Sequence, residues 1–146
     1  MTYVSSHPAF NNRSLANDFA VLHLSQEFVL SPHVDVACLP TGDYSNYDKA
    51  NCVAMGWGKD KFGDKGQYQV ILRQVPLDLV SNYDCQERLR DSRLGEFFEL
   101  DDSFVCALGR NSEDTCRGDG GGPLMCRTQG GSYVQVCAIG YTLCTL

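Results

Sequence analysis

Apolar residues occur in short runs separated by Gly, Asn, Asp and Pro, a pattern typical of strands joined by turns. The runs that we interpret as strands cover residues 19–24, 51–57, 69–80, 104–108, 123–126 and 133–139. Pro76 has no N–H group to donate to a neighbouring strand, so it predicts an edge strand or a bulge in the third run. The polar segment with Lys59, Asp60, Lys61, Asp64 and Lys65 is expected to be a solvated loop.

Residues 81–90 have the pattern of a single helix. Ser81 is a suitable N-cap, Asp84 lies near the start, and Arg88 and Arg90 lie near the end, where the helix dipole favours each charge. Short strands with one helix predict an all-β barrel or sandwich. The chain has no internal repeat, no low-complexity segment and no linker-like composition that would mark a domain boundary.

Composition narrows the possible functions. The 146 residues are 43% hydrophobic, which is enough for one domain with a core and too little for two ordinary domains. The net charge of -6 argues against a basic surface for nucleic acid or anionic lipid. No apolar stretch approaches the roughly 18 residues needed to span a bilayer. We therefore expect neither nucleic acid nor membrane among the partners.

Eight cysteines indicate a disulfide framework and a secreted, extracellular protein. No Cys-x-x-Cys pair occurs, which argues against zinc ribbons and thioredoxin-like redox sites. The first residues lack the basic and apolar regions of a signal peptide, so we expect the chain to be incomplete. His7, His23 and His33 have no metal-ligand spacing and are expected at the surface or in packing, and no metal or cofactor is predicted.

The stretch from Asp114 to Pro123 contains three consecutive glycines, Gly120–Gly122, directly after an aspartate. Glycine permits positive φ and close backbone approach, and successive N–H groups in such a turn can bind an anion. Either a phosphate cradle or the oxyanion hole of an acyl-transfer site would use this turn. A phosphate cradle needs a following helix, whereas residues 123–126 are predicted as a strand, so the oxyanion hole is favoured.

Five segments, in the family's order, resemble the chymotrypsin/trypsin-like serine proteases. They are the catalytic-aspartate segment 17–22, the connector between barrels 36–40, the start of the second barrel 54–58, the intermediate-helix segment 83–85 and the nucleophile loop 118–123. The resemblance implies an all-β, trypsin-like double β-barrel, with the first barrel incomplete and the second nearly complete. It places the end of the first barrel and the connector at residues 1–40. The second barrel, without its C-terminal strand and helix, then covers residues 41–146.

The resemblance makes Asp18 the aspartate of a catalytic triad, but Gly120 stands in the place of the serine nucleophile. Glycine has no hydroxyl and cannot form an acyl-enzyme. The family's histidine segment, Ala-Ala-His-Cys, does not occur in the sequence. An aspartate that only orients a histidine does no chemistry alone. We therefore expect no enzyme, although the Gly118 and Gly120 N–H groups would still form an oxyanion hole.

The resemblance also implies the residues of a substrate pocket. Asp114, six residues before the nucleophile position, takes the place of the carboxylate that selects Arg or Lys. Gly140, Tyr141 and Thr142 align with the pocket wall, and Thr142 would narrow the mouth that a glycine normally keeps open. Asp119 corresponds to the residue that pairs with a new N-terminus after zymogen cleavage. That N-terminus does not occur in this sequence, so the resemblance leaves Asp119 unpaired.

The family pattern selects among the many possible cysteine pairings. It implies the disulfides Cys52–Cys126, Cys85–Cys106 and Cys116–Cys144, and it assigns Cys38 to an upstream segment. Cys137 is additional, and is either a buried free thiol or a competitor of Cys144 for Cys116.

Two short surface motifs remain. Asn12-Arg-Ser14 is an N-glycosylation sequon. Arg117-Gly-Asp119 spells an integrin-type tripeptide, but it arises from the loop motif and is expected to be partly buried, so adhesion is not favoured.

Glycine in place of serine, with the Asp114-Thr-Cys116 segment retained, is similar to the clip-domain serine protease homologues of arthropods. This resemblance implies a non-catalytic binding or cofactor module in an extracellular proteolytic cascade, in innate immunity and prophenoloxidase activation during melanisation. The partners would be prophenoloxidase or a clip-domain protease. The alternatives are a trypsin-like endopeptidase with Arg/Lys preference, whose missing groups come from elsewhere, and a truncated product without independent function.

Overall fold

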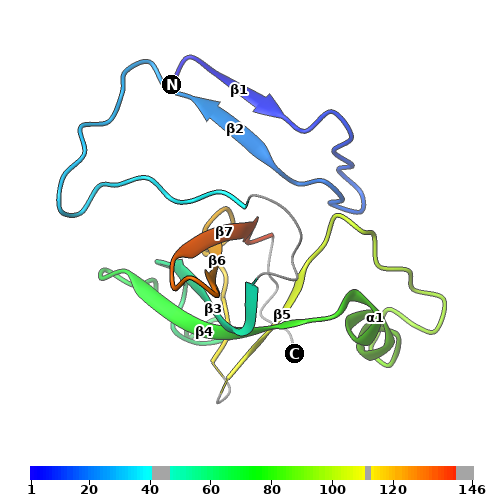
Figure 1. The fold of residues 1–146 in the computed structure, drawn as a ribbon. Helices are drawn as coiled ribbons and strands as arrows, with labels where there is room; N and C mark the ends of the chain where they lie inside the picture. Colours follow the sequence, from blue (N-terminus) through cyan, green and yellow to red (C-terminus); the bar gives the residue numbers. More distant parts are fainter. Residues whose placement is uncertain (41–46, 111–112, 141–146) are drawn as a thin grey trace. The chain divides into compact units, whose positions relative to one another are not determined.

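The computed structural model describes residues 1–40, 47–110 and 113–140. The chain divides into two compact units, Met1–Ala37 and Cys38–Leu146, and each contains one antiparallel sheet among these residues (Figure 1). The assignment of residues 1–40 to the end of a first barrel and its connector stays a prediction.

The first unit contains a two-stranded sheet formed by β1 (Tyr3–Ser6) and β2 (Ala20–His23). The sequence predicted β2 but not β1, because half of the Tyr-Val-Ser-Ser run is polar. The His23 ring stacks on Tyr3 with 3.8 Å between ring centroids, and its Nε2 lies 3.1 Å from Ser5 Oγ. His23 is therefore a packing residue, as predicted.

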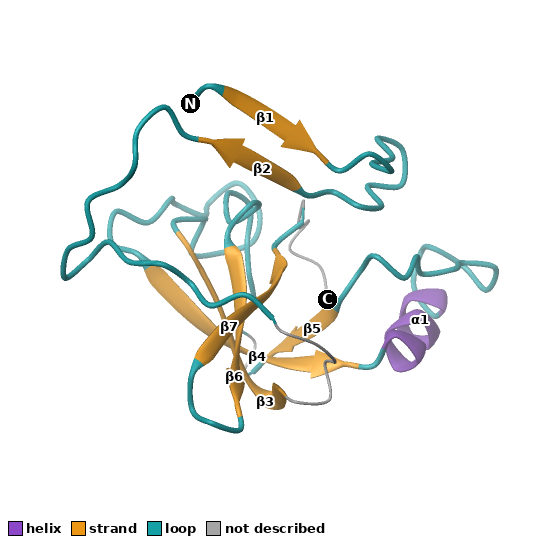
Figure 2. Cartoon of the chain, turned by 45° about the horizontal axis from the view of Figure 1, so that its top comes forward, coloured by secondary structure: helices purple, strands orange, loops and turns teal. Residues whose placement is uncertain are grey.

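The second unit contains a five-stranded sheet in the order β5-β4-β3-β6-β7 (Figure 2). Its strands are β3 (Tyr47–Gly56), β4 (Arg73–Val80), β5 (Cys106–Gly109), β6 (Pro123–Thr128) and β7 (Tyr133–Ala138). The predicted all-β class is confirmed. Within the described residues, however, both sheets are open and neither closes into a barrel.

The core of the second unit lies on one face of this sheet. Its buried residues occupy alternate positions within a strand and therefore point to the same side. They are Cys52 and Ala54 in β3, Leu77 in β4, Leu124 and Cys126 in β6, and Val134 and Val136 in β7. The Cys52–Cys126 disulfide joins residues that are directly opposite in the β3–β6 register.

Pro76 lies in β4, an interior strand between β3 and β5, so the predicted edge strand is wrong. β5 ends at Gly109, opposite Leu77, and the Pro76 carbonyl accepts a hydrogen bond from Arg110 N at 3.4 Å. The N–H and C=O positions of one strand residue face the same neighbour. The missing N–H therefore faces the position of Arg110, one residue beyond the end of β5, where the Pro76 carbonyl still accepts a bond. β4 also begins later than predicted, at Arg73.

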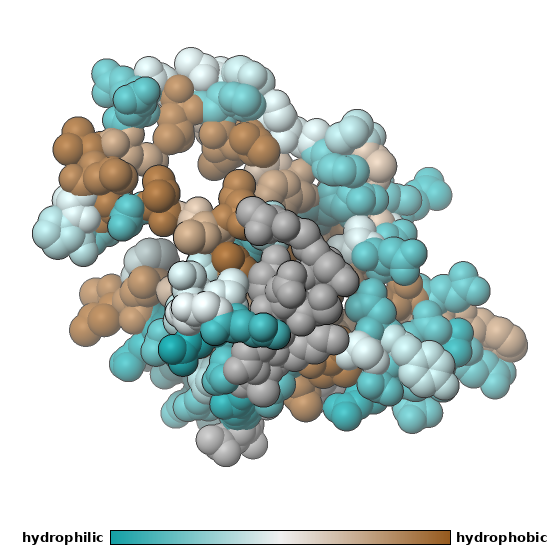
Figure 3. Space-filling view, in the orientation of Figure 1, coloured by the Kyte–Doolittle hydropathy of each residue, from teal (hydrophilic) through white to brown (hydrophobic). Residues whose placement is uncertain are grey.

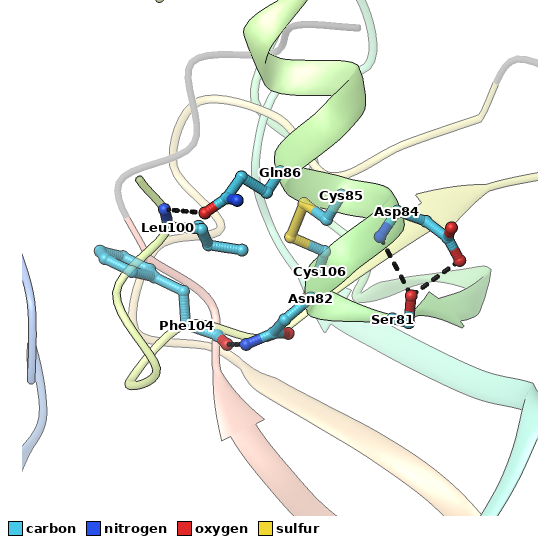
Figure 4. The surroundings of a disulfide bond; sticks show 8 residues. All are labelled: Ser81, Asn82, Asp84, Cys85, Gln86, Leu100, Phe104 and Cys106. Carbon is cyan, nitrogen blue, oxygen red and sulfur yellow. Dashed lines mark hydrogen bonds between the residues drawn. A yellow bond between two sulfur atoms is a disulfide. The ribbon is translucent and has the colours of Figure 1, made fainter. Parts of the chain in front are cut away.

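The only helix among the described residues, α1 (Asn82–Arg90), follows β4 as predicted. The Ser81 Oγ accepts a hydrogen bond from Asp84 N at 3.1 Å and caps the helix. The Cys85–Cys106 disulfide joins α1 to the start of β5 (Figure 4). Two side chains of α1 also bind the intervening loop: Asn82 Nδ2 donates to Phe104 O, and Gln86 Oε1 accepts from Leu100 N.

Candidate functional site

The nucleophile loop that the resemblance implied, residues 118–123, follows β5 and leads into β6, and Asp119 anchors it. The Asp119 carboxylate accepts hydrogen bonds from Gly58 N at 2.7 Å and from Cys116 N at 2.8 Å. A Cβ at Gly58 would lie 2.5 Å from this carboxylate, and a Cβ at Gly56 would overlap it, so both glycines are needed for the close approach. Asp119 has no ion-pair partner among the described residues, and these two backbone N–H groups bind its carboxylate instead.

The backbone N–H groups of residues 118–122 fall into two sets. Three are satisfied within the fold: Asp119 N donates to Cys116 O, Gly121 N to Ile139 O and Gly122 N to Asp119 O. The N–H groups of Gly118 and Gly120 donate to no other residue in the described part of the chain, and both glycines are exposed. These two donors are the ones predicted to form the oxyanion hole.

Gly118 and Gly120 are glycines for different reasons. Gly118 has φ 105°, and a Cβ there would lie 2.7 Å from Tyr68 Cε1, so a larger residue would be both strained and blocked. At Gly120 a Cβ would meet only Gly140 O, at 3.3 Å, and φ is not in the left-handed region. The backbone conformation therefore does not require glycine at position 120. What distinguishes Gly120 from the serine expected there is the missing hydroxyl group.

A cavity of about 570 Å³ lies beside this loop in the second unit. Asp114 and Asp119 line it, together with residues of β3, β4 and the loop after β3. The Asp114 Oδ1 accepts a hydrogen bond from Thr115 N at 2.7 Å. The cavity therefore brings together two of the predicted site carboxylates.

Basic side chains at this cavity were missed by the sequence interpretation. Lys59 and Lys61 line it, although their loop was predicted to be merely solvated, and Arg73 lines it from β4. The position of the two lysines in the chain could have indicated their place at the cavity. Their loop directly follows residues 56–58, the segment whose backbone contacts the Asp119 carboxylate.

Asp18 is exposed in the first unit, two residues before the start of β2. The adjacent Asn17 has φ 56°, and its carbonyl accepts a hydrogen bond from Phe19 N at 2.8 Å, so a tight turn presents Asp18. Asn12, the predicted glycosylation site, is exposed in the loop between β1 and β2. The assignment of Asp18 to a vestigial triad stays a prediction.

The cysteines of the second unit follow much of the implied pattern. The Cys52–Cys126 and Cys85–Cys106 disulfides are present. Cys116 is also disulfide-bonded, and its expected partner Cys144 lies outside the described residues, as do Tyr141 and Thr142. Gly140 is exposed just after β7.

Cys137 and Cys38 are free cysteines. Cys137 is half-buried, and desolvation raises the pKa of its thiol. Its pairing with Cys116 does not occur, which leaves the free-thiol alternative. Cys38 is exposed, and its carbonyl accepts a hydrogen bond from Gln135 N at 2.9 Å.

Arg117 and Gly118 of the Arg-Gly-Asp tripeptide are exposed, but Asp119 is partly buried and its carboxylate is engaged as described above. In the described ranges, no cluster of His, Cys, Asp or Glu is arranged to hold a metal ion. No helix in those ranges is both long and apolar enough to cross a bilayer.

Comparison with known proteins gives consistent matches. The family model described as Trypsin matches residues 1–144. The chain is 47% identical over 137 residues to phenoloxidase-activating factor 2 of Galleria mellonella. It is 44% identical over 133 residues to inactive CLIP domain-containing serine protease A3 of Aedes aegypti. It is 34% identical over 137 residues to inactive CLIP domain-containing serine protease A8 of Anopheles gambiae.

These alignments cover 92%, 89% and 94% of this chain but only 45%, 27% and 37% of the respective relatives. The chain therefore spans less than half the length of the curated relatives that it matches.

Proposed function

The chain belongs to the trypsin family, and we propose that it is a non-catalytic member that acts as a binding or cofactor module in an extracellular proteolytic cascade. Its strand-rich architecture agrees with a trypsin-like fold. Two of the relatives carry the word inactive in their names, and another is named for the activation of phenoloxidase.

Gly120 is the observation that carries the proposal. It stands where active family members have the serine of Gly-Asp-Ser-Gly-Gly-Pro, and it offers no hydroxyl for an acyl-enzyme. A Cβ there would lie 3.3 Å from Gly140 O, which is a tight contact and not an overlap, so an outright clash does not account for the missing side chain. The remaining elements of the loop, the Asp119 anchor and the exposed amides of Gly118 and Gly120, suit binding without covalent chemistry.

The proposed partner is prophenoloxidase or a clip-domain protease, and the proposed process is prophenoloxidase activation in melanisation. A secreted protein suits the disulfide framework, because such bonds persist in oxidising compartments. Asn12 would carry a glycan on the exposed loop between β1 and β2. Asp114 would face an Arg or Lys side chain if the cavity accepts one.

A fluorophosphonate probe tests the absence of catalysis. The chain is incubated with the probe beside an active trypsin-like protease, and labelling is followed by gel fluorescence and mass spectrometry. We expect labelled protease and unlabelled chain. Covalent labelling of a residue in this chain would contradict the proposal and favour a hydrolase whose missing groups come from elsewhere.

A reconstituted activation assay tests the cofactor role. Prophenoloxidase is incubated with a clip-domain protease, with and without the chain, and phenoloxidase activity is measured. We expect more phenoloxidase activity in the mixture that contains the chain than in the mixture without it. Prophenoloxidase mixed with the chain alone, without the protease, should show none. Equal activity in both mixtures would contradict a cofactor role for these residues.

A further inference from the structure

We propose that the loop between α1 and β5, residues 91–105, is a docking surface for a basic, amphipathic polypeptide segment, with Phe97 as its central apolar contact. Such a segment would pack its apolar side chains against Phe97 and place its Lys or Arg side chains beside the acidic residues of the loop. The inference rests on the proposed binding role, because it gives that role an interface. No residue of the loop lines the cavity beside Asp114 and Asp119.

Phe97 is the first support, because its ring is almost entirely in water. It is 89% exposed, more than any other aromatic residue whose exposure the structure describes. The loop projects beyond α1, away from the five-stranded sheet, in both ribbon views (Figures 1 and 2). Aromatic side chains dominate the energy of protein interfaces once a partner covers them, so Phe97 is suited to anchor one.

The second support is the regular conformation of the loop around Phe97. Gly95 N donates to Ser92 O at 3.2 Å, and Phe98 N donates to Gly95 O at 3.0 Å, which defines two successive four-residue turns. Gly95 joins them with φ 83°, a conformation that suits glycine. The central residues of a turn form its corner, and Leu94 and Phe97, both exposed, take the same position in the two turns. The loop therefore presents two apolar side chains at corners.

The third support is the attachment of this loop to α1. Arg90 Nε donates to Phe98 O at 2.8 Å, directly after Phe97. Gln86 Oε1 accepts a hydrogen bond from Leu100 N at 2.9 Å, beside the disulfide that joins α1 to β5 (Figure 4). A loop that is held in place before binding loses less conformational freedom when a partner binds. The attachment therefore favours binding through Phe97.

Charge defines the chemistry of the partner. Residues 91–102 include one basic residue, Arg93, and five acidic residues, all exposed: Asp91, Glu96, Glu99, Asp101 and Asp102. None of the five forms an ion pair with another described residue. Ser103 N donates to Asp101 Oδ1 at 2.9 Å, and this hydrogen bond lowers the pKa of Asp101, which stays charged. Phe97 is thus surrounded in sequence by negative charge.

This negative charge selects among the possible occupants of the loop. A second copy of the chain would bring a like-charged loop and a net charge of -6, and an anionic lipid surface would also be repelled. A segment with Lys or Arg beside its apolar residues matches both features of the loop. Complementary charge raises the association rate and rejects acidic competitors, so the favoured partner is a basic polypeptide.

Fluorescence anisotropy with three labelled, C-terminally amidated peptides tests the proposal on the 146-residue chain. The first peptide has Lys and Leu at helical spacing, the second has Ser in place of each Leu, and the third has Glu in place of each Lys. We expect the Lys/Leu peptide to bind at least about tenfold more tightly than either of the others. Its affinity should fall as salt is added.

Substitution of Phe97 tests the apolar contact. Phe97→Ala should weaken binding of the Lys/Leu peptide about tenfold, whereas Phe97→Leu, which keeps an apolar side chain, should retain most of the affinity. Val70→Ala is the matched control, because Val70 is 94% exposed in the same unit and lies outside the loop. It should leave the affinity unchanged.

Substitution of two acids tests the charge. Glu96→Gln/Glu99→Gln should weaken binding about two- to fivefold, as expected for exposed charges, and should make the affinity less sensitive to salt. Glu27→Gln/Asp64→Asn removes the same charge from two other exposed positions and should have a smaller effect on both.

Three results would overturn the proposal. They are equal binding of the Lys/Leu and Lys/Ser peptides, equal losses in Phe97→Ala and Val70→Ala, and self-association of the unmodified chain in analytical ultracentrifugation that Phe97→Ala abolishes. The last result would identify a second copy as the occupant. The peptide titration needs neither prophenoloxidase nor a protease, so it can fail while the cofactor assay succeeds, and the reverse.

Discussion

The two units of this chain contrast in how they bury apolar residues. The second unit has a contiguous core on one sheet face, with Cys126 at 0% and Leu77 at 3% exposure. In the first unit, Ala16 is the only buried apolar residue among those described. Large apolar side chains of the first unit lie on the surface instead (Figure 3). Among them are Leu22 at 57% and Val29 at 87% exposure.

The candidate site lies in the unit that has the apolar core. The Asp119 anchor, the exposed amides and the cavity all belong to the unit with the core and the cross-strand disulfide. Asp18 belongs to the unit with almost no core of its own. Burial supplies the dominant favourable term in folding, so we expect substitutions in the second unit to have large effects and comparable substitutions in the first to have small ones.

Removal of a disulfide should give the largest effect. Cys52→Ala/Cys126→Ala opens a loop of 74 residues, and Cys85→Ala/Cys106→Ala opens one of 21. Loop-closure entropy predicts losses of about 4 and about 3 kcal/mol in the free energy of unfolding. Urea unfolding followed by circular dichroism measures both. A smaller loss for the 74-residue pair than for the other would show that chain entropy does not set the order.

A pair of leucines compares the two units directly. Leu77→Ala removes a buried side chain from the core and should cost about 2–4 kcal/mol. Leu22→Ala alters an exposed position in β2 and should stay within about 0.5 kcal/mol. The same urea experiment reports both values. A comparable loss at Leu22 would show that the first unit buries this side chain in solution and that the contrast is wrong.

The Asp119 anchor should have a smaller effect. Asp119→Asn keeps the size of the side chain but replaces a charged acceptor of two N–H groups with a neutral amide that has one acceptor atom. We expect a loss of about 1–3 kcal/mol. The Gly118 and Gly120 amide signals should also move, because the anchor holds their loop. Asp64→Asn, in the exposed loop, is the control, and unchanged amide signals in Asp119→Asn would contradict an anchoring role.

The local part of the fold was largely predictable from the sequence. The strands of the second unit and the Ser81-capped helix follow from periodicity and capping, which act over a few residues. The partners of Asp119 were not predictable, since Gly58 lies 61 residues away and its role depends on a tertiary approach. Pro76 misled for the same reason: it lies in an interior strand, at the position just beyond the last β4–β5 pair, Leu77–Gly109, and that position depends on the tertiary pairing of the strands.

The helix cap should give the smallest effect in this comparison. Ser81→Ala removes the acceptor of the Asp84 N–H group and should cost about 1 kcal/mol. Ser6→Ala in β1 is the matched control, because its hydroxyl has no hydrogen bond to a described residue, and it should change the free energy of unfolding by less than about 0.5 kcal/mol. Thermal melts of both variants provide the measurement. Equal midpoints for Ser81→Ala and the unmodified chain would mean that the disulfide and the Asn82 and Gln86 contacts fix α1 without its cap.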